Sequence, residues 1–114
     1  MNGYEIYNKA LIRLGYKGTG DNEVLDSRIV GRALEFINQI AIDLKLNTVS
    51  NLSEEISNSS EICEAVCCGV AMMLSLSEGD ANKNVIFTAL YNAKRAAALS
   101  KTSFIEDNLP VAEG

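Results

Sequence analysis

The segment from Ile62 to Leu76 places the strongest constraint on the fold. It is apolar at almost every position, and only Glu64, Gly69 and Ser75 interrupt it. As a helix, this segment carries apolar side chains on nearly all sides and must be buried by neighbouring elements. Its unbroken apolar part is shorter than the ~20 residues needed to cross a bilayer. The sequence therefore predicts a central helix, beginning near residue 61, in a soluble bundle.

Three more segments have the spacing of amphipathic helices, with apolar residues three and four positions apart. They cover about residues 3–14, 23–46 and 81–99. Asn2 and Gly15 have the residue types that begin and end a helix, and Gly79 ends the central one. The apolar stripe of the last segment, its expected buried face, consists of Ile86, Leu90, Ala93 and Ala97. Val85, Phe87 and Tyr91 widen this stripe toward neighbouring faces.

Two regions depart from the helical pattern. Residues 47–60 are rich in Ser and Asn and form a long connection for a compact domain. They are compatible with one short helical turn at residues 52–56 or with a loop throughout. From Ser100 onward the helical period is lost. Within the helices, Gly31 and Gly69 predict places where a neighbouring helix approaches closely.

These patterns predict an all-α fold: a compact bundle of about four helices, a long interhelical loop and an extended C-terminal tail. A chain of 114 residues is long enough for one domain and hardly for two. We place the helical domain at residues 1–101 and the C-terminal tail or arm at residues 102–114.

The charge balance and the absence of histidine narrow the possible functions. The chain has 10 Lys and Arg against 15 Asp and Glu, a formal charge of −5, and no histidine. An acidic surface is poorly suited to neutralising nucleic-acid phosphates. Without histidine the chain lacks the commonest general base and the commonest metal ligand. We therefore expect a protein that is not an enzyme and binds no cofactor.

The three cysteines, Cys63, Cys67 and Cys68, all lie in the predicted central helix. An odd number of cysteines in one short apolar stretch is not typical of a disulfide framework. A structural zinc ion needs four ligands, and no distant Cys or His completes a set. We interpret the thiols as small core residues, and we expect no metal site. They indicate a reducing compartment, and the N-terminal residues lack the order of a signal peptide, which favours the cytoplasm.

Two other patterns resemble catalytic motifs only in part. The glycines of residues 15–21 follow no predicted strand, so a plain interhelical loop is favoured over a phosphate site. The carboxylate pairs Glu54–Glu55 and Glu61–Glu64 are typical of solvated loop and helix N-terminal positions. A metal-dependent hydrolase that uses these carboxylates is the least favoured function of those considered.

Two small basic groups are predicted on helix surfaces. Arg28 and Arg32 lie one turn apart on the exposed side of the second helix, and Lys94 and Arg95 lie near the end of the last. Such cations form ion pairs with acidic residues of the same chain, for example Glu35, or with a neighbouring subunit. The four cations are our candidate subunit-interface residues.

The expected tail is more apolar than a fully solvated terminus. Its apolar residues are Phe104, Ile105, Leu109 and Val111. Two interpretations are open: the tail folds back over its own bundle, or it is an arm that becomes ordered when it docks on another protein. Pro110 disfavours a helix at this position. In the second interpretation these four residues form a partner-docking site.

Three stretches, taken in order, carry a resemblance to a known family. The first is an opening helix that ends in Leu-Gly, residues 8–16 (NKALIRLGY). The second is a long helix with a regular aliphatic stripe, residues 32–41 (RALEFINQIA). The third is a small-residue helix with a Gly-Asp break into a Tyr-bearing helix, residues 69–80 (GVAMMLSLSEGD) and 90–95 (LYNAKR). Together they resemble the small helical head–tail connector, or adaptor, proteins of tailed bacteriophages and prophages, over most of residues 4–98.

The resemblance implies a structural protein of the virion neck region that is assembled in the cytoplasm of the bacterial host. Many copies would form a ring between the portal and the tail. The implied partners are further copies, the portal protein and neck or tail proteins. DNA would pass with at most transient, non-specific contact, and no membrane is involved. The alternative, from another class, is a small cytoplasmic helical adaptor or regulatory binding module that acts as a monomer or dimer.

Overall fold

Four helices make up the described part of the chain. The computed structural model describes residues 1–16 and 27–107, with side chains as far as Ser100. The helices are α1 (Gly3–Leu14), α2 (Ser27–Asp43), α3 (Ser60–Ser77) and α4 (Ala81–Asp107). The predicted all-α bundle of four helices with a long interhelical loop is confirmed.

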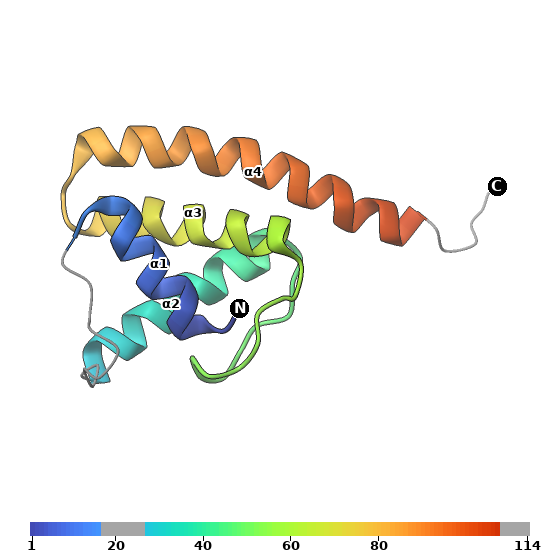
Figure 1. Cartoon of the computed structure of the whole chain (residues 1–114), viewed down its shortest axis with the longest axis horizontal. Helices are drawn as coiled ribbons and strands as arrows, with labels where there is room; N and C mark the ends of the chain where they lie inside the picture. Colours follow the sequence, from blue (N-terminus) through green and yellow to red (C-terminus); the bar gives the residue numbers. More distant parts are fainter. Residues whose placement is uncertain (17–26, 108–114) are drawn as a thin grey trace.

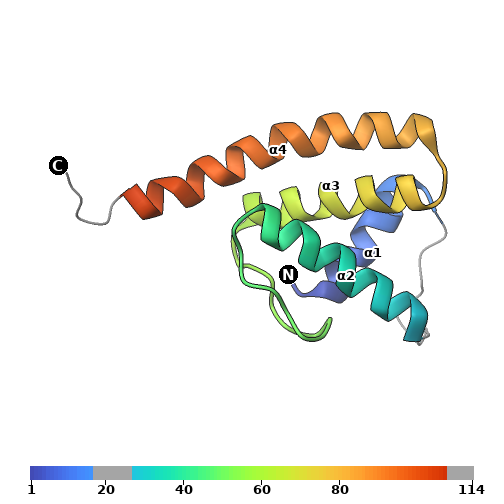
Figure 2. The same cartoon turned by 180° about the vertical axis from the view of Figure 1, so that it is seen from behind.

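α3 is the central helix, as predicted. It packs against α1, α2 and α4, and α4 runs back along it after a short turn (Figures 1 and 2). The side chain of Ser59 caps its first turn by accepting the N–H of Ile62. Of the described helices, α3 alone is long and apolar enough to cross a membrane, and 56% of that stretch is buried inside the bundle. Core packing therefore accounts for its apolar composition.

α1 begins and ends where the sequence predicts. The side chain of Asn2 accepts the N–H of Glu5 at 2.9 Å, and the Glu5 carboxylate accepts the N–H of Asn2 at 2.8 Å. This reciprocal capping satisfies N–H groups that have no partner within the helix. Gly15 ends α1 with φ +76°, a left-handed conformation that favours glycine. Residues 17–26, which include most of the glycine-rich loop and the predicted start of the second helix, lie outside the described residues.

The connection between α2 and α3, residues 44–59, is attached to α1 (Figure 1). Leu52 is 1% exposed and lies against Gly3. The N–H of Tyr4 donates to the Leu52 carbonyl at 3.2 Å, and the N–H of Ile56 donates to the Met1 carbonyl at 2.9 Å. Residues 52–56 form no helical turn, so the loop alternative is the correct one.

α2 ends at Asp43, three residues before the predicted end. Lys45 adopts a left-handed backbone with φ +62°, and the N–H of Leu46 returns to a carbonyl of the last helical turn. The side chain of Asn38 then holds the departing chain through two hydrogen bonds with the backbone of Val49, at 2.8 and 2.9 Å. The end of α2 is therefore determined by local backbone geometry that its apolar spacing does not reveal.

The two helix glycines have different environments. A Cβ atom at Gly69 would lie within 3 Å of three side-chain carbons of Ile40 on α2, whereas one at Gly31 would meet nothing within 4 Å. The predicted close approach is confirmed for Gly69 and is wrong for Gly31, which lies on the exposed side of α2.

α4 buries a different side from the one predicted. Phe87, Tyr91 and Ala98 face the core. The residues exposed instead are those of the predicted stripe: Ile86, Leu90, Ala93 and Ala97. Two aromatic side chains remove more apolar surface from water than two aliphatic side chains and two alanines do. The helix is therefore rotated to bury its aromatic residues, and the stripe faces solvent.

α4 is also longer than predicted. It continues past Leu99 to Asp107, and its last turns project beyond α3 (Figures 1 and 2). At 1.5 Å per residue α4 is about 40 Å long, against about 27 Å for α3. The boundary placed between residues 101 and 102 therefore falls inside a helix. Residues 108–114 lie outside the described residues.

The three cysteines are buried and unpaired in α3, in agreement with their interpretation as core residues. Burial raises the pKa of Cys67 to about 11 and also raises the pKa of Cys68. A thiol reacts as its thiolate, and a raised pKa leaves less thiolate at a given pH, so Cys67 and Cys68 react slowly. We expect Ellman's reagent to modify none of the three thiols in the native protein at mildly alkaline pH, and all three after unfolding. Rapid modification of the native protein would contradict this burial.

Candidate interaction surface

The solvent side of α4 is apolar and uncharged from Ala81 to Ala93, and the exposed Lys94 borders its later part. Val85, Ile86 and Leu90 are 70%, 56% and 42% exposed. None of the exposed positions between Ala81 and Ala93 carries a charged side chain. We call this surface the α4 face; it consists of Val85, Ile86, Ala89, Leu90, Ala93 and Ala97.

The outer sides of the two other peripheral helices differ from the α4 face. Glu5 and Lys9 on α1, and Glu35 on α2, are charged and exposed. The exposed large apolar residues of these helices, Tyr4, Ile12 and Ile42, do not form a continuous stripe. Single exposed apolar residues are normal, whereas a contiguous apolar patch indicates an interaction surface. The α4 face is therefore the stronger candidate.

Polar contacts on the buried side of α4 determine which side faces outward. The Tyr91 hydroxyl donates to Oδ2 of Asp43 on α2 at 2.5 Å, and Nε of Arg95 donates to the same oxygen at 2.7 Å. Near the start of α4, the side-chain amide of Asn84 donates to the carbonyl of Met72 on α3 at 2.9 Å. The α4 face cannot turn inward without the loss of these bonds at both ends of the contact.

The contact with Asp43 predicts a loss of stability in acid. Hydrogen bonds from Arg95, and then from Tyr91, hold the pKa of Asp43 below its ordinary value of 3.8. A lowered folded-state pKa stabilises the fold above pH 3.8, and this stabilisation is lost as the pH falls through the folded-state pKa. We expect the urea midpoint of the wild type to fall more steeply below about pH 4 than that of Asp43→Asn.

Paired urea titrations of the two proteins between neutral and acidic pH measure this difference. The ion pair of Glu64 is retained in both proteins, so the difference between them isolates Asp43. Parallel pH profiles of the urea midpoint would show that ionised Asp43 does not stabilise the fold through its contact with Arg95 and Tyr91.

Arg32 and Arg95, both predicted interface cations, have partners within the chain. Arg95 binds Asp43. Nη1 of Arg32 donates to the Ser77 hydroxyl at 3.2 Å and lies 3.6 Å from the Glu78 carboxylate. Of the alternatives left open by the sequence, the intrachain ion pair is the one that these contacts show.

The other two predicted cations are exposed and lie on different helices. Arg28 is near the start of α2. Lys94 borders a surface hollow together with Ser60, Glu61 and Glu64. The structure therefore does not gather the four cations into one basic patch.

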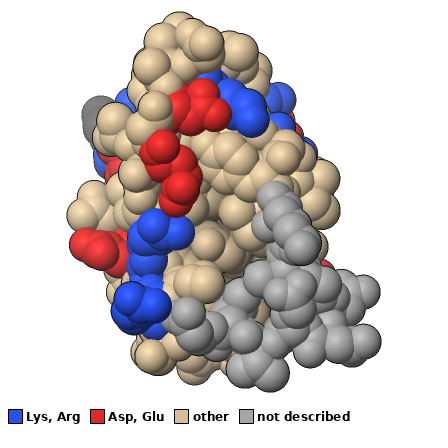
Figure 3. Space-filling view, turned by 90° about the vertical axis from the view of Figure 1, so that its left-hand side faces the viewer, with Lys and Arg blue, Asp and Glu red and all other residues tan. Residues whose placement is uncertain are grey.

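The end of the molecule where α3 turns into α4 carries mixed charge. Figure 3 shows basic and acidic side chains side by side on this end. Nζ of Lys83 lies 3.7 Å from the Asp80 carboxylate and 4.8 Å from the centre of the Tyr16 ring. The Tyr16 hydroxyl donates to Asp80 at 3.3 Å. Exposed ion pairs of this kind contribute little stability, and the mixed signs do not favour a partner of one charge.

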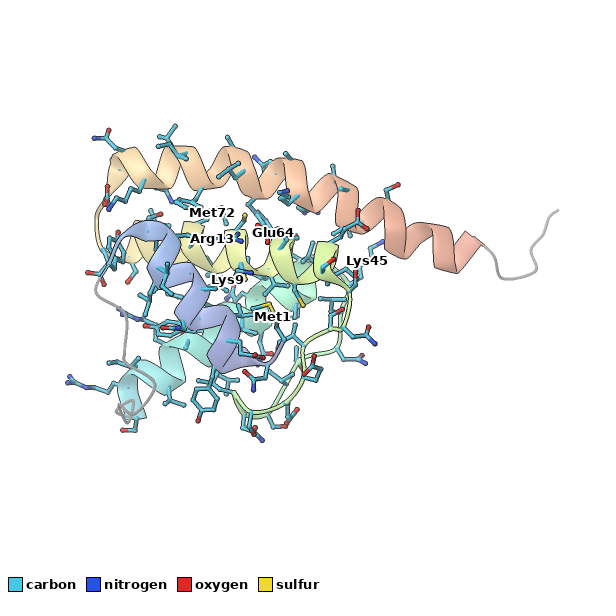
Figure 4. All side chains as sticks on the ribbon, viewed as in Figure 1. Met1, Lys9, Arg13, Lys45, Glu64 and Met72 are labelled. Carbon is cyan, nitrogen blue, oxygen red and sulfur yellow. The ribbon has the colours of Figure 1, made fainter. Side chains whose placement is uncertain are left out.

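Arg13 on α1 and Glu64 on α3 form an ion pair that no sequence pattern predicts. Nη2 of Arg13 donates to Oε1 of Glu64 at 2.8 Å, and Figure 4 shows the two side chains close together where α1 crosses α3. This bond lowers the pKa of Glu64. Glu64 is thus a partner of a specific cation, in contrast to its sequence interpretation as a solvated carboxylate.

The carboxylate pair of the loop is also used in local structure. The Met1 amino group donates to the Glu55 carboxylate at 2.6 Å, and the Glu54 carboxylate accepts the N–H of Ser50 at 3.1 Å. Across residues 1–16 and 27–100, His, Cys, Asp and Glu side chains form no group of three or more that could hold a metal ion. These contacts give the carboxylates a structural role in holding the loop.

The predicted docking residues of the tail lie at the limit of the structure. Phe104 and Ile105 belong to the projecting end of α4, where the backbone is described and the side chains are not. Leu109 and Val111 lie outside the described residues. Both interpretations of the tail therefore stay predictions.

The described geometry favours assembly with another molecule. It combines the α4 face, the projecting end of α4 and a set of polar contacts that fix the orientation of this helix. Comparison of the chain with protein-family models, curated proteins and solved structures finds no match.

Proposed function

We propose that this protein is a non-enzymatic structural protein of a phage or prophage particle, in which copies form an oligomeric ring that joins the portal or head to the tail. The observation that carries the proposal is the α4 face on a helix that projects beyond its own bundle. A contiguous apolar patch on a soluble protein marks an interaction site. The order of sequence features, which resembles head–tail connector proteins, supports this assignment.

The charge of the chain suits a ring through which DNA passes. A formal charge of −5 repels phosphates, so DNA would make at most transient, non-specific contact with the channel. In this proposal the ring is part of the virion neck, assembled in the bacterial cytoplasm. Its partners are further copies, the portal protein and neck or tail proteins.

In this proposal the cations Arg28, Arg32, Lys94 and Arg95 remain candidate subunit contacts. Acidic residues outnumber basic ones in the chain, so acidic side chains are available on a neighbouring subunit to pair with exposed cations. Ion pairs at such positions affect the rate and register of association more than its strength.

Native mass spectrometry over a hundredfold range of protein concentration tests the proposal. We expect a closed species of many identical subunits, whose population grows with concentration. A monomer or dimer at every concentration would reject the self-assembling ring. It would favour the alternative, a small cytoplasmic helical adaptor or regulatory module.

A further inference from the structure

The spacing of the α4 face is that of a helix–helix seam. Ile86, Leu90, Ala93 and Ala97 follow one another at steps of four, three and four residues, and all four are exposed. Steps that alternate between three and four keep a stripe facing one partner helix in a left-handed pair. Within the described residues this stripe is not covered by any other element of the chain. Its spacing therefore fits a helix from another molecule.

We infer that the α4 face binds α4 of a second copy of this chain, with the two helices antiparallel. If the two-fold axis passes between residues 91 and 92, each large residue of the stripe faces a small one. Ile86 then lies opposite Ala97 of the second copy, and Leu90 lies opposite Ala93. Alternation of large and small side chains across a seam lets two helices interdigitate without voids. The stripe is thus complementary to itself in the antiparallel direction.

The charge of the face also favours a second copy. Burial of an unpaired charge is costly, so an uncharged face requires a partner surface without charge. The outer sides of α1 and α2 carry exposed charges such as Lys9 and Glu35. Among the described helices, α4 itself offers an apolar stripe that matches, with the exposed Lys94 at its border.

The area of the seam predicts a dissociable contact. The stripe from Ile86 to Ala97 spans about 17 Å of helix, so at a width of about 10 Å it covers on the order of 200 Å² per copy. This is below the roughly 800 Å² per partner of a standard stable interface. We therefore expect an association whose extent varies with protein concentration.

This contact goes beyond the proposed ring. A two-fold contact uses the same surface on both copies and closes on itself, whereas a ring needs two different surfaces on each subunit. The pair occupies the α4 face, so ring contacts would use other surfaces, such as the projecting end of α4, and the two proposals fail separately.

The experiment compares the double variant Ile86→Glu/Leu90→Glu with the wild type by sedimentation velocity over a range of concentrations. We expect the dissociation constant of the pair to rise at least about tenfold, since the variant places unpaired carboxylates in the seam. The matched control is Ile42→Glu, which adds a carboxylate at a residue of α2 that is 64% exposed. The control is expected to associate like the wild type. Circular dichroism checks that all three proteins keep their helicity.

Spin labels test the direction of the pair. Because the native thiols are buried, labels attach to cysteines introduced at Asn82→Cys and Ser100→Cys, both at exposed positions. In the antiparallel pair a label at 82 lies across from one at 100 in the other copy. Two labels at 82 are separated by about 28 Å along the helix. Mixed samples should therefore give a short distance between labels, and samples labelled only at 82 a long one.

Several results would overturn the inference. A wild type that is monomeric throughout the concentration range would do so, as would association that is unchanged in Ile86→Glu/Leu90→Glu. A short distance between two labels at residue 82 would show a parallel contact and reject the antiparallel pair. Rings in the wild type, together with a pair that the double variant leaves unchanged, would keep the proposed function and reject this contact. A pair that dissociates in the variant, with no ring in the wild type, would reject the function and keep the contact.

Discussion

Substitution of Gly69 by leucine is expected to destabilise the fold by about 3 kcal/mol, near the upper end of the range for overpacked cores. A Cβ atom at this position would lie 2.7 to 2.9 Å from three side-chain carbons of Ile40. Ile40 is β-branched and 4% exposed, so it has few other rotamers in which to avoid the added atoms. Urea unfolding followed by circular dichroism measures the change in the free energy of unfolding.

The matched control is Gly31→Ala, the other glycine inside a helix. A methyl group there meets no atom within 4 Å, and alanine has the higher helix propensity. The control should therefore stabilise the fold, by about 0.5–1 kcal/mol. If Gly69→Leu unfolded at the same urea concentration as the wild type, the close packing of α3 on α2 at this position would be disproved.

Truncation of Leu52 to alanine is expected to cost about 2–5 kcal/mol, the range for buried leucines. Leu52 is 1% exposed and covers Gly3 at the start of α1, so its loss leaves a cavity between α1 and the loop. The same urea measurement gives the size of the loss. Protection of the Tyr4 amide from hydrogen exchange should also fall, because this amide donates to the Leu52 carbonyl.

Ile42→Ala is the control for this truncation. Ile42 is 64% exposed on α2, and a substitution at such a position usually changes the free energy of unfolding by less than about 0.5 kcal/mol. Equal effects of the two truncations would show that Leu52 does not anchor the loop in solution.

The ends of α1 and the start of α3 could be predicted because their signals are local. Asn2 and Glu5 cap each other across three residues, Gly15 adopts the left-handed conformation that ends the helix, and Ser59 caps α3. Each of these contacts joins residues less than one turn apart. Residue type and spacing are then sufficient to predict the contact.

The residues of the candidate surface could also be found in the sequence, but not their orientation. Ile86 and Leu90 were recognised as a stripe, yet the fold buries Phe87 and Tyr91. α4 has apolar residues on more than one side. Each side repeats with the same period of 3.6 residues, so the period alone does not identify the buried side. The choice between the sides depends on Asp43 of α2, which accepts hydrogen bonds from α4.

The sequence by itself determined that the chain forms a helical bundle around Ile62–Leu76, because a helix without a polar side has to be enclosed. It also determined the caps of α1 and the approximate start of α3, since these depend on near neighbours. The tertiary structure decided the partners of Arg13, Arg32 and Arg95 and the side of α4 that meets water. These contacts join residues far apart in the chain. They depend on how the shapes of whole helices fit, and no short stretch of sequence contains that information.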